Sequence, residues 1–254
     1  MNCQLQWLFI LQCLVVLSAA LATVDVCIVG DSTLQMFAAM WDACETTPTL
    51  PCAFKTVDGG IYHVQHYKGS TFYRKTKIVR SLCYDNATAM FLDFHSFDWL
   101  LMARDFWRAR GREVSCRRTI TNFHHHAITY FPHPRTADSV ANMMRETETA
   151  LQSSLGATAP IAWLLPTLPL DNNPEFPQTL RGVTETSILM SASGAETIAT
   201  LQLLTARLQQ IHRDFFFDRM HVDRAKLRND SFTVLAIQGF LAQEFKRAAA
   251  TRIV

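Results

Sequence analysis

The sequence predicts an α/β fold with one mainly parallel β-sheet between two layers of helices. Short apolar runs, typical of buried strands, alternate with longer segments whose apolar residues recur every three or four positions, as in amphipathic helices. Of the 254 residues, 49% are hydrophobic and 18% are charged, as in a globular protein with a sizeable core. No repeat, low-complexity block or shift in composition indicates a second domain. Residues 23–254 are therefore expected to form a single domain.

Strands and helices are expected to alternate along the chain. The first strand, at residues 24–29, leads directly into a helical stretch in which Leu34 and Phe37 share one face. Residues 46–88 and 166–178 are rich in Pro, Gly or Asn and are expected to be mainly loops, with short strands in the former. The remaining strands are expected at residues 89–94, 119–123, 161–165 and 215–217, and the remaining helices at residues 98–110, 138–155, 195–211 and 232–245.

The first 22 residues are expected to form a signal peptide. Residues 8–17 are an almost unbroken apolar run, followed by small residues that predict cleavage after Ala22. The alternative is an uncleaved anchor, although the run is short for a membrane span, and no later segment resembles one. The expected location is the secretory pathway, either outside the cell or in the lumen of the ER or Golgi.

Cysteines and glycosylation motifs agree with that location. Two of the seven cysteines lie in the leader, and an oxidising lumen favours disulfides among the other five. Cys44 and Cys52 flank a Pro-containing loop and are expected to pair. Cys83 and Cys116 are the second expected pair, which leaves Cys27 buried and free. Asn86 and Asn229 each begin an Asn-x-Ser/Thr motif, the acceptor pattern for N-glycosylation.

Neither nucleic acid nor a metal or other cofactor is expected to bind this chain. The net charge is only +2, and no Lys/Arg run accompanies aromatic residues, so nucleic acid is not an expected partner. Of the three consecutive histidines, only His124 and His126 would share a strand face, and no further ligand completes a metal site. Neither a metal nor another cofactor is therefore expected.

Ser32 is the candidate nucleophile. It follows the first strand at the start of a helix, and ligands of open α/β sheets bind beyond the carboxyl ends of the strands. Main-chain N–H groups at a helix start would stabilise an oxyanion formed from an ester. Near the other end of the chain, Asp218 and His221 form an Asp-x-x-His pair that supplies a base and a carboxylate to orient it. The alternatives are a helix cap at Ser32 and a surface salt bridge at Asp218 and His221.

Together these two motifs resemble the first and last blocks of the SGNH, or GDSL, hydrolase superfamily. The string Gly-Asp-Ser-Thr-Leu-Gln from Gly30 onward is similar to the opening block of the PC-esterase branch, which includes the trichome-birefringence-like polysaccharide O-acetyltransferases and relatives of neurexophilin-like proteins. The resemblance implies a three-layer α/β/α fold with a flavodoxin-like sheet. It also implies an acyl-serine intermediate on Ser32, with His221 as general base and then acid and Asp218 holding its tautomer.

The same resemblance implies two oxyanion donors, a Gly after the second strand and an Asn after the third. Gly60, or its neighbour Gly59, is the candidate for the first. Asn122 is the candidate for the second, at the start of residues 122–126, which are loosely similar to the Asn-x-Gly-His-Trp-Trp block of PC-esterases. His125 falls on the His of that block, whereas its Gly is absent here.

The expected function is therefore a serine esterase or O-acyltransferase acting on an ester, in particular an O-acetyl group, of a glycan. Water and a sugar hydroxyl remain alternative acceptors of the acyl group. Two other functions stay open, namely a secreted hydrolase of lipids or small esters and a binding protein that has kept the SGNH fold without turnover. The sequence predicts no oligomeric state.

Overall fold

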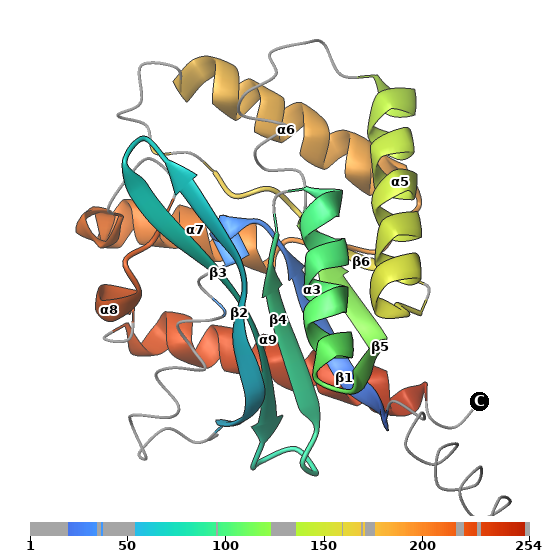
Figure 1. Cartoon of the computed structure of the whole chain (residues 1–254). Helices are drawn as coiled ribbons and strands as arrows, with labels where there is room; N and C mark the ends of the chain where they lie inside the picture. The colour runs from blue at the N-terminus through green and yellow to red at the C-terminus, as the bar shows by residue number, and fades with distance from the viewer. Residues whose placement is uncertain are drawn as a thin grey trace, which may run out of the picture.

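The structure is a computed structural model and describes residues 20–34, 37, 54–94, 96–122, 136–158, 160–168, 170, 176–216, 221–227 and 230–251 (Figure 1). The strands are β1 (Ala20–Gly30), β2 (Phe54–Tyr67), β3 (Ser70–Ser81), β4 (Thr88–Asp93), β5 (Arg112–Thr121), β6 (Ala162–Leu164) and β7 (Thr197–Ile198). The α-helices are α3 (Phe97–Ala109), α5 (Ala137–Leu155), α6 (Phe176–Ala192), α7 (Thr200–Ile211), α8 (Arg224–Leu227) and α9 (Ser231–Ala250), and the 3-10 helices are η1 (Ser32–Leu34) and η2 (Arg213–Phe215).

All the strands in the described part of the chain join one sheet, in the order β2-β3-β4-β1-β5-β6-β7. Whereas β3 is antiparallel to both β2 and β4, the strands β4, β1, β5, β6 and β7 are parallel to one another. Numbered among themselves along the chain, they have the order 2-1-3-4-5, which is that of flavodoxin-like sheets. The predicted fold class is confirmed.

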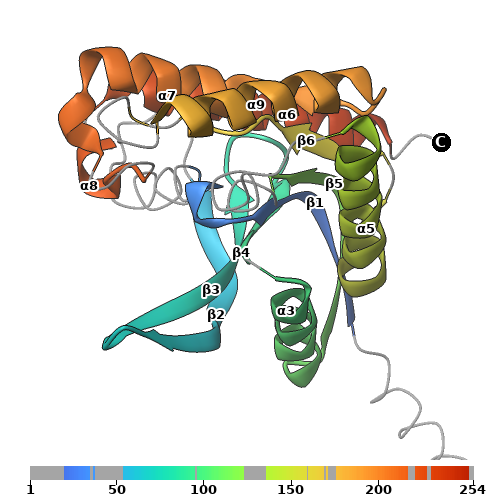
Figure 2. The ribbon, with the colours of Figure 1, turned by 90° about the horizontal axis from the view of Figure 1, so that it is seen from above.

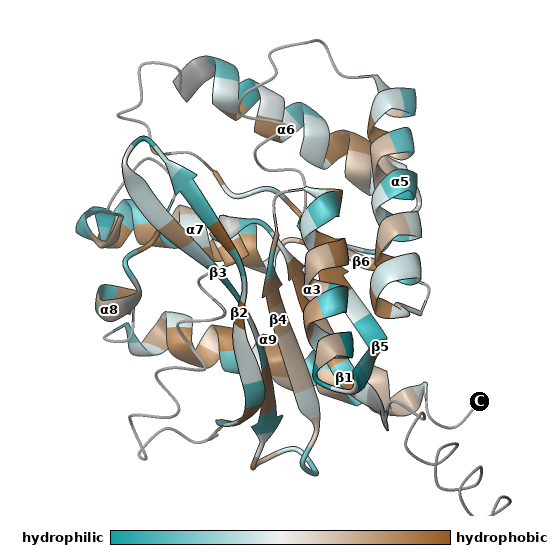
Figure 3. Ribbon diagram, viewed as in Figure 1, coloured by the Kyte–Doolittle hydropathy of each residue, from teal (hydrophilic) through white to brown (hydrophobic). Residues whose placement is uncertain are grey.

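Helices cover both faces of this sheet (Figure 2). On one face α7 and α9 bury their apolar sides, including Leu204 and Ile237, against residues such as Ile28 of β1. On the other face α3 and α5 bury Leu100 and Leu151 in a second core. Each fully buried side chain of this size contributes roughly 1.5–3 kcal/mol to stability. The apolar residues of β4, between these layers, form one of the most hydrophobic parts of the ribbon (Figure 3).

The expectation that residues 46–88 are mainly loop is wrong over most of this segment. Its described part contains β2 and β3, two long antiparallel strands. Lys68 (φ 48°) and Gly69 (φ 78°) form their two-residue turn, and two successive positive φ angles are typical of a type I′ hairpin. Register shifts between Thr56 and Asp58 and between Ile61 and His63 interrupt the alternation of β2, so period two is hard to see in the sequence.

Other elements also differ from expectation. The helix α6 begins within the segment expected to be a loop, and β7 occupies the start of the helix expected at residues 195–211. The strand expected at residues 215–217 is not part of the sheet, since residues 213–215 form η2 and Phe216 makes a single bridge to Val222. A two-residue strand such as β7 carries no periodicity that a sequence pattern would reveal.

The strand β1 begins earlier than expected. Ala20 and Ala22 already pair with Arg112 and Val114 of β5. Residues 1–19 lie outside the described residues, so the leader remains a prediction. Cleavage after Ala22 would remove the first three residues of β1. None of the helices among the described residues has the length and hydropathy needed to cross a membrane.

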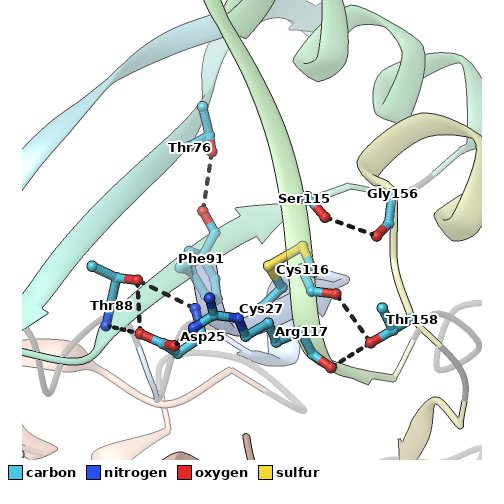
Figure 4. The surroundings of a disulfide bond; sticks show 10 residues. All are labelled: Asp25, Cys27, Thr76, Thr88, Phe91, Ser115, Cys116, Arg117, Gly156 and Thr158. Carbon is cyan, nitrogen blue, oxygen red and sulfur yellow. Dashed lines mark hydrogen bonds and ion pairs between the residues drawn. A yellow bond between two sulfur atoms is a disulfide. The ribbon is translucent and has the colours of Figure 1, made fainter. Parts of the chain in front are cut away.

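A disulfide joins Cys27 of β1 to Cys116 of β5, with 5.8 Å between their Cα atoms (Figure 4). Both cysteines are fully buried. The expectation that Cys27 is free and that Cys83 pairs with Cys116 is therefore wrong, and Cys83 is exposed after β3. Cys44 and Cys52 lie outside the described residues. The pairing depends on β1 and β5 being neighbours, which spacing along the chain does not reveal.

Asp25 ties β1 to both neighbouring strands beside this disulfide. Its carboxylate accepts a hydrogen bond from the main-chain N–H of Thr88 in β4 (2.8 Å) and another from the Arg117 guanidinium in β5 (2.7 Å) (Figure 4). Asp25 itself is buried. A buried carboxylate is stable only when it is paired in this way, so these contacts help to fix the register of the three strands.

A second, partly buried ionic cluster joins the sheet to α9. Arg118 of β5 donates two hydrogen bonds to Glu196 (2.6 Å each) and one to Glu244 of α9 (2.8 Å). Arg247 donates to the same two carboxylates, at 2.9 Å and 2.8 Å. The Glu244 side chain is only 1% exposed. The hydrogen bond from Arg118, with the charges of both arginines, outweighs burial and holds the pKa of Glu196 below its ordinary value.

We predict that Arg118→Met destabilises the protein by about 3 kcal/mol, because it removes the central cation from the buried Glu244 carboxylate and the partly exposed Glu196. The depressed pKa of Glu196 gives stability that is present above the ordinary pKa of 4.5 and is lost as pH falls through the folded-state value. The free energy of unfolding of the wild type, measured in urea, should therefore fall below about pH 4.5. In the variant this fall should be smaller. Arg181→Met, which breaks an exposed ion pair with Glu185, is the control. It should change neither the free energy of unfolding nor its dependence on pH. Equal effects of the two variants would contradict the prediction.

Candidate functional site

A tight turn follows β1 at the carboxyl edge of the parallel strands. Asp31 directs this turn, because its carboxylate accepts hydrogen bonds from the Thr33 main-chain N–H (3.0 Å) and the Thr33 hydroxyl (2.7 Å). The Leu34 N–H donates to the Asp31 carbonyl at 3.0 Å. Asp31 is 1% exposed, so it is a buried organiser of the turn and not a surface residue. The main chain of Ser32 lies inside the turn, as the first residue of η1.

Asn122, immediately after β5, is hydrogen-bonded to this turn. Its Oδ1 accepts from the Asp31 main-chain N–H at 3.0 Å, and its Nδ2 donates to Asp31 Oδ1 at 3.2 Å and to Thr33 Oγ1 at 2.6 Å. A main-chain N–H only donates and a carboxylate only accepts, so these partners fix the orientation of the amide. The structure thus brings Asn122 to the Gly-Asp-Ser turn, 91 positions away in the sequence.

Gly30 makes this approach possible. A Cβ at this position would lie 1.9 Å from Asn122 Oδ1 and 2.7 Å from a methyl group of Leu34. Atoms do not approach so closely, so any side chain here would displace the amide. Gly30 is therefore required because no side chain fits at this position.

The end of β4 completes the edge of the site. The Phe94 N–H donates to the Gly30 carbonyl at 2.7 Å, and Asp93 pairs with Arg74 of β3 at 3.1 Å. The Tyr62 hydroxyl donates to the main-chain carbonyl of Asp93. Burial and the nearby negative charge of Asp93 raise the pKa of Tyr62 far above its ordinary value and outweigh the opposing effect of Arg74. Tyr62 therefore remains a neutral donor. The guanidinium of Arg74 also lies 4.8 Å from the centre of the Trp99 ring.

The segment around His221 is anchored in the core that also contains residues following the Ser32 turn. Val222, next to His221, belongs to the same buried cluster as Leu34 and Phe37, which follow the Ser32 turn. The Phe37 ring packs on Phe240 of α9, with centroids 5.4 Å apart. His221 is partly exposed.

Asp230 fixes the end of this loop as the cap of α9. Its carboxylate accepts hydrogen bonds from the Thr233 N–H (3.2 Å) and from Arg207 of α7 (2.6 Å). Burial acts to raise the pKa of Asp230, but these hydrogen bonds outweigh it and hold the pKa below its ordinary value. An ionised Asp230 therefore anchors both the loop and the first turn of α9.

Gly60 lies away from the turn. It belongs to β2, which β3 and β4 separate from β1 by three strand spacings, about 14 Å. A Cβ at Gly60 would meet the Phe106 ring at 2.9 Å, so this glycine makes room for packing against α3. The residue that directly follows the second parallel strand, β4, is Phe94.

Several predicted site residues cannot be compared with the structure. Asp218, His125 and Asn229 lie outside the described residues, as does the Ser32 side chain. The arrangement of Ser32, His221 and Asp218 as a triad therefore stays a prediction. No group of His, Cys, Asp or Glu in the described ranges is suited to hold a metal ion.

Asn86 is exposed in the turn between β3 and β4, with φ 55°. Its motif partner Thr88 is engaged through its hydroxyl with Asp25 at the amino end of β4. A glycan on Asn86 would therefore project from the edge opposite the Ser32 turn and would leave that turn open. Glycosylation itself remains a prediction.

We predict that Gly30→Ala and Asn122→Ala each destabilise the protein by about 2–4 kcal/mol, since each breaks the buried hydrogen bonds of the turn. The double variant should be little worse than either single variant, because both act on one network. Gly239→Ala is the control, because a Cβ there meets nothing within 4 Å and alanine favours a helix. Chemical unfolding measures all four variants, and simple addition of the two single effects would contradict the shared network.

We also predict that the chain carries a glycan on Asn86 when it is made in secreting cells, because this sequon is exposed. Enzymatic deglycosylation should reduce the mass of the wild type, and Asn86→Gln should remove the part of that change due to this site. A mass change that Asn86→Gln leaves intact would refute the assignment.

Comparison of the sequence with models of protein families and with curated proteins finds no match.

Proposed function

We propose that this protein is a serine-dependent esterase or O-acyltransferase of the SGNH kind. The observation that carries the proposal is the buried turn of Gly30, Asp31 and Ser32 at the carboxyl end of β1, which Asn122 reaches from β5. In an open α/β sheet this is the edge at which ligands bind. The proposal is supported by the shared buried cluster of Val222, next to His221, and Leu34, which follows Ser32.

In the proposed reaction, Ser32 Oγ attacks the ester carbonyl while His221 takes the hydroxyl proton. The tetrahedral intermediate then collapses, the bond to the leaving alcohol breaks, and His221 returns the proton to that alcohol. Water or a sugar hydroxyl next attacks the acyl-serine, with His221 again as the base. Asp218 holds the tautomer of His221 throughout.

Stabilisation of the oxyanion is the most demanding part of this proposal. Both Nδ2 hydrogens of Asn122 already have acceptors, Asp31 Oδ1 and Thr33 Oγ1. An oxyanion would have to replace one of these acceptors. The main-chain N–H of Ser32 is the other candidate donor at the turn.

We further propose an acylated carbohydrate as the substrate and the secretory pathway as the location. The buried disulfide between Cys27 and Cys116 supports an oxidising compartment, where O-acylated glycans occur. The exposed sequon at Asn86 agrees with this location. An ester of a lipid or small alcohol is the alternative substrate.

One observation favours a second candidate function, a binding protein without turnover. The amide of Asn122 is fully used within the turn, and Phe94 directly follows β4, where the resemblance implies a glycine. If neither group serves an oxyanion, the fold would retain the substrate surface and lose the reaction.

A fluorophosphonate probe distinguishes the two functions, because it labels only an activated serine. We predict labelling of the wild type at Ser32, and its loss by a factor of at least about a thousand in Ser32→Ala and His221→Ala. Asp218→Asn should retain more, because it removes only the orientation of the base. Ser153→Ala, at an exposed serine of α5, is the matched control and should label normally. A folded wild type that is never labelled would favour the binding protein.

A further inference from the structure

The hairpin of β2 and β3 has an unbalanced charge. Residues 54–81, which form the hairpin, contain six of the 24 Lys and Arg residues of the chain and one of the 22 Asp and Glu residues. The rest of the chain is therefore net negative, although the whole carries +2. A local concentration of one charge beside a site attracts ligands of the opposite charge.

Part of this charge lies on one exposed face. Tyr73, Lys75 and Lys77 alternate along β3 and so point to the same side. Tyr73 is paired with Val64 and Lys75 with Ile61 across the hairpin. The exposed fractions are 57% for Tyr73, 46% for Ile61 and 43% for Val64. We call these five residues, with Lys68 at the turn, the basic hairpin face.

This face lies close to the candidate site. Thr76 of β3 pairs with Leu92 of β4, which lies next to Val29 of β1, so Lys75 is level with Gly30 and residues 70–74 extend past the end of β1. Val79, on the same side of β3 as Lys75, belongs to the same buried cluster as Leu34. The tip of the hairpin projects beyond the sheet and is largely hydrophilic (Figures 1 and 3).

Two cations of this face, Lys68 and Lys75, are exposed and available to a ligand. Lys68 lies over the Tyr67 ring, 5.3 Å from its centre, and neither Lys68 nor Lys75 has an ion pair with a described residue. Arg74, on the opposite face of β3, differs because Asp93 and Trp99 already hold its guanidinium. Lys68 and Lys75 are thus the charges that a bound anion would meet first.

We propose that the basic hairpin face binds an anionic polysaccharide, carboxylated or sulfated, beside the Ser32 turn. The lysines match the negative groups, and the exposed Tyr73 ring offers a flat apolar surface to a sugar ring. The buried disulfide favours an oxidising compartment, where the abundant polyanions are glycans and not nucleic acids. The inference rests on the proposed function in one respect, that this polysaccharide carries the acyl group or accepts it.

The test measures binding of the full chain to heparin, a sulfated polysaccharide, and to polygalacturonate, a carboxylated one, with dextran as the neutral reference. Binding should weaken as salt rises, because exposed charges are screened. The double variant Lys68→Gln with Lys75→Gln should bind the preferred polyanion roughly fivefold more weakly, since two exposed ion contacts are lost. The control double variant, Arg181→Gln with Lys246→Gln, removes the same charge elsewhere on the surface and should bind like the wild type.

Three results would overturn the inference: no binding to either polyanion at low salt, an equal loss in the control variant, or tighter binding to single-stranded DNA or phosphatidylserine vesicles than to both polysaccharides. Fluorophosphonate labelling separates this inference from the proposed function. Labelling of Ser32 without polyanion binding refutes the hairpin face alone, whereas hairpin-dependent binding without labelling refutes the chemistry alone.

Discussion

The hydrogen bonds between the Asn122 amide and the turn after β1 are the constraint on which the candidate site depends. They tie the ends of two neighbouring parallel strands, and they require Gly30 to lack a side chain. The Asp31 carboxylate accepts a hydrogen bond from this amide and another from the main-chain N–H of Thr33. Burying a polar group costs free energy unless the group is hydrogen-bonded. This network therefore fixes the path of the backbone directly after β1. The position of Ser32 follows from that path.

The sequence predicted the elements that carry strong periodicity. The helices α3, α5 and α9 and the strand β4 lie within a few residues of their expected positions, because each presents a continuous apolar stripe or run. The hairpin was missed because bulges break the alternation of β2 and because Gly59 and Gly60 resemble loop residues. Those glycines make room for the β3 backbone and for Phe106, contacts that exist only in the folded sheet. The disulfide likewise depends on strand order, which no local pattern encodes.

The candidate site was predictable to a different extent. The motifs pointed to Ser32 and Asn122, and the structure brings the Asn122 side chain to the main chain of that turn. Nothing in the sequence marked Arg74 or Tyr62, because they meet Asp93 only where β2, β3 and β4 lie side by side. The basic residues of β3 were overlooked for a related reason. They lie in a segment expected to be mainly loop, and only a strand places Lys75 and Lys77 on one face.

The bond between Asn122 and Thr33 suggests how one amide could serve both the turn and the proposed reaction. In the resting protein, Nδ2 donates to a neutral hydroxyl, and the turn stays closed. An oxyanion is a stronger acceptor, since hydrogen bonds to charged groups are roughly twice as strong as neutral ones. It would therefore be favourable for Asn122 Nδ2 to exchange the Thr33 hydroxyl for the substrate oxygen only once negative charge develops on that oxygen. An interaction that strengthens only in the transition state is the kind that accelerates a reaction, because it does not stabilise the bound substrate equally. The engaged amide of the resting structure is thus compatible with turnover, provided that Thr33 can give up its donor while Asp31 keeps the turn in place.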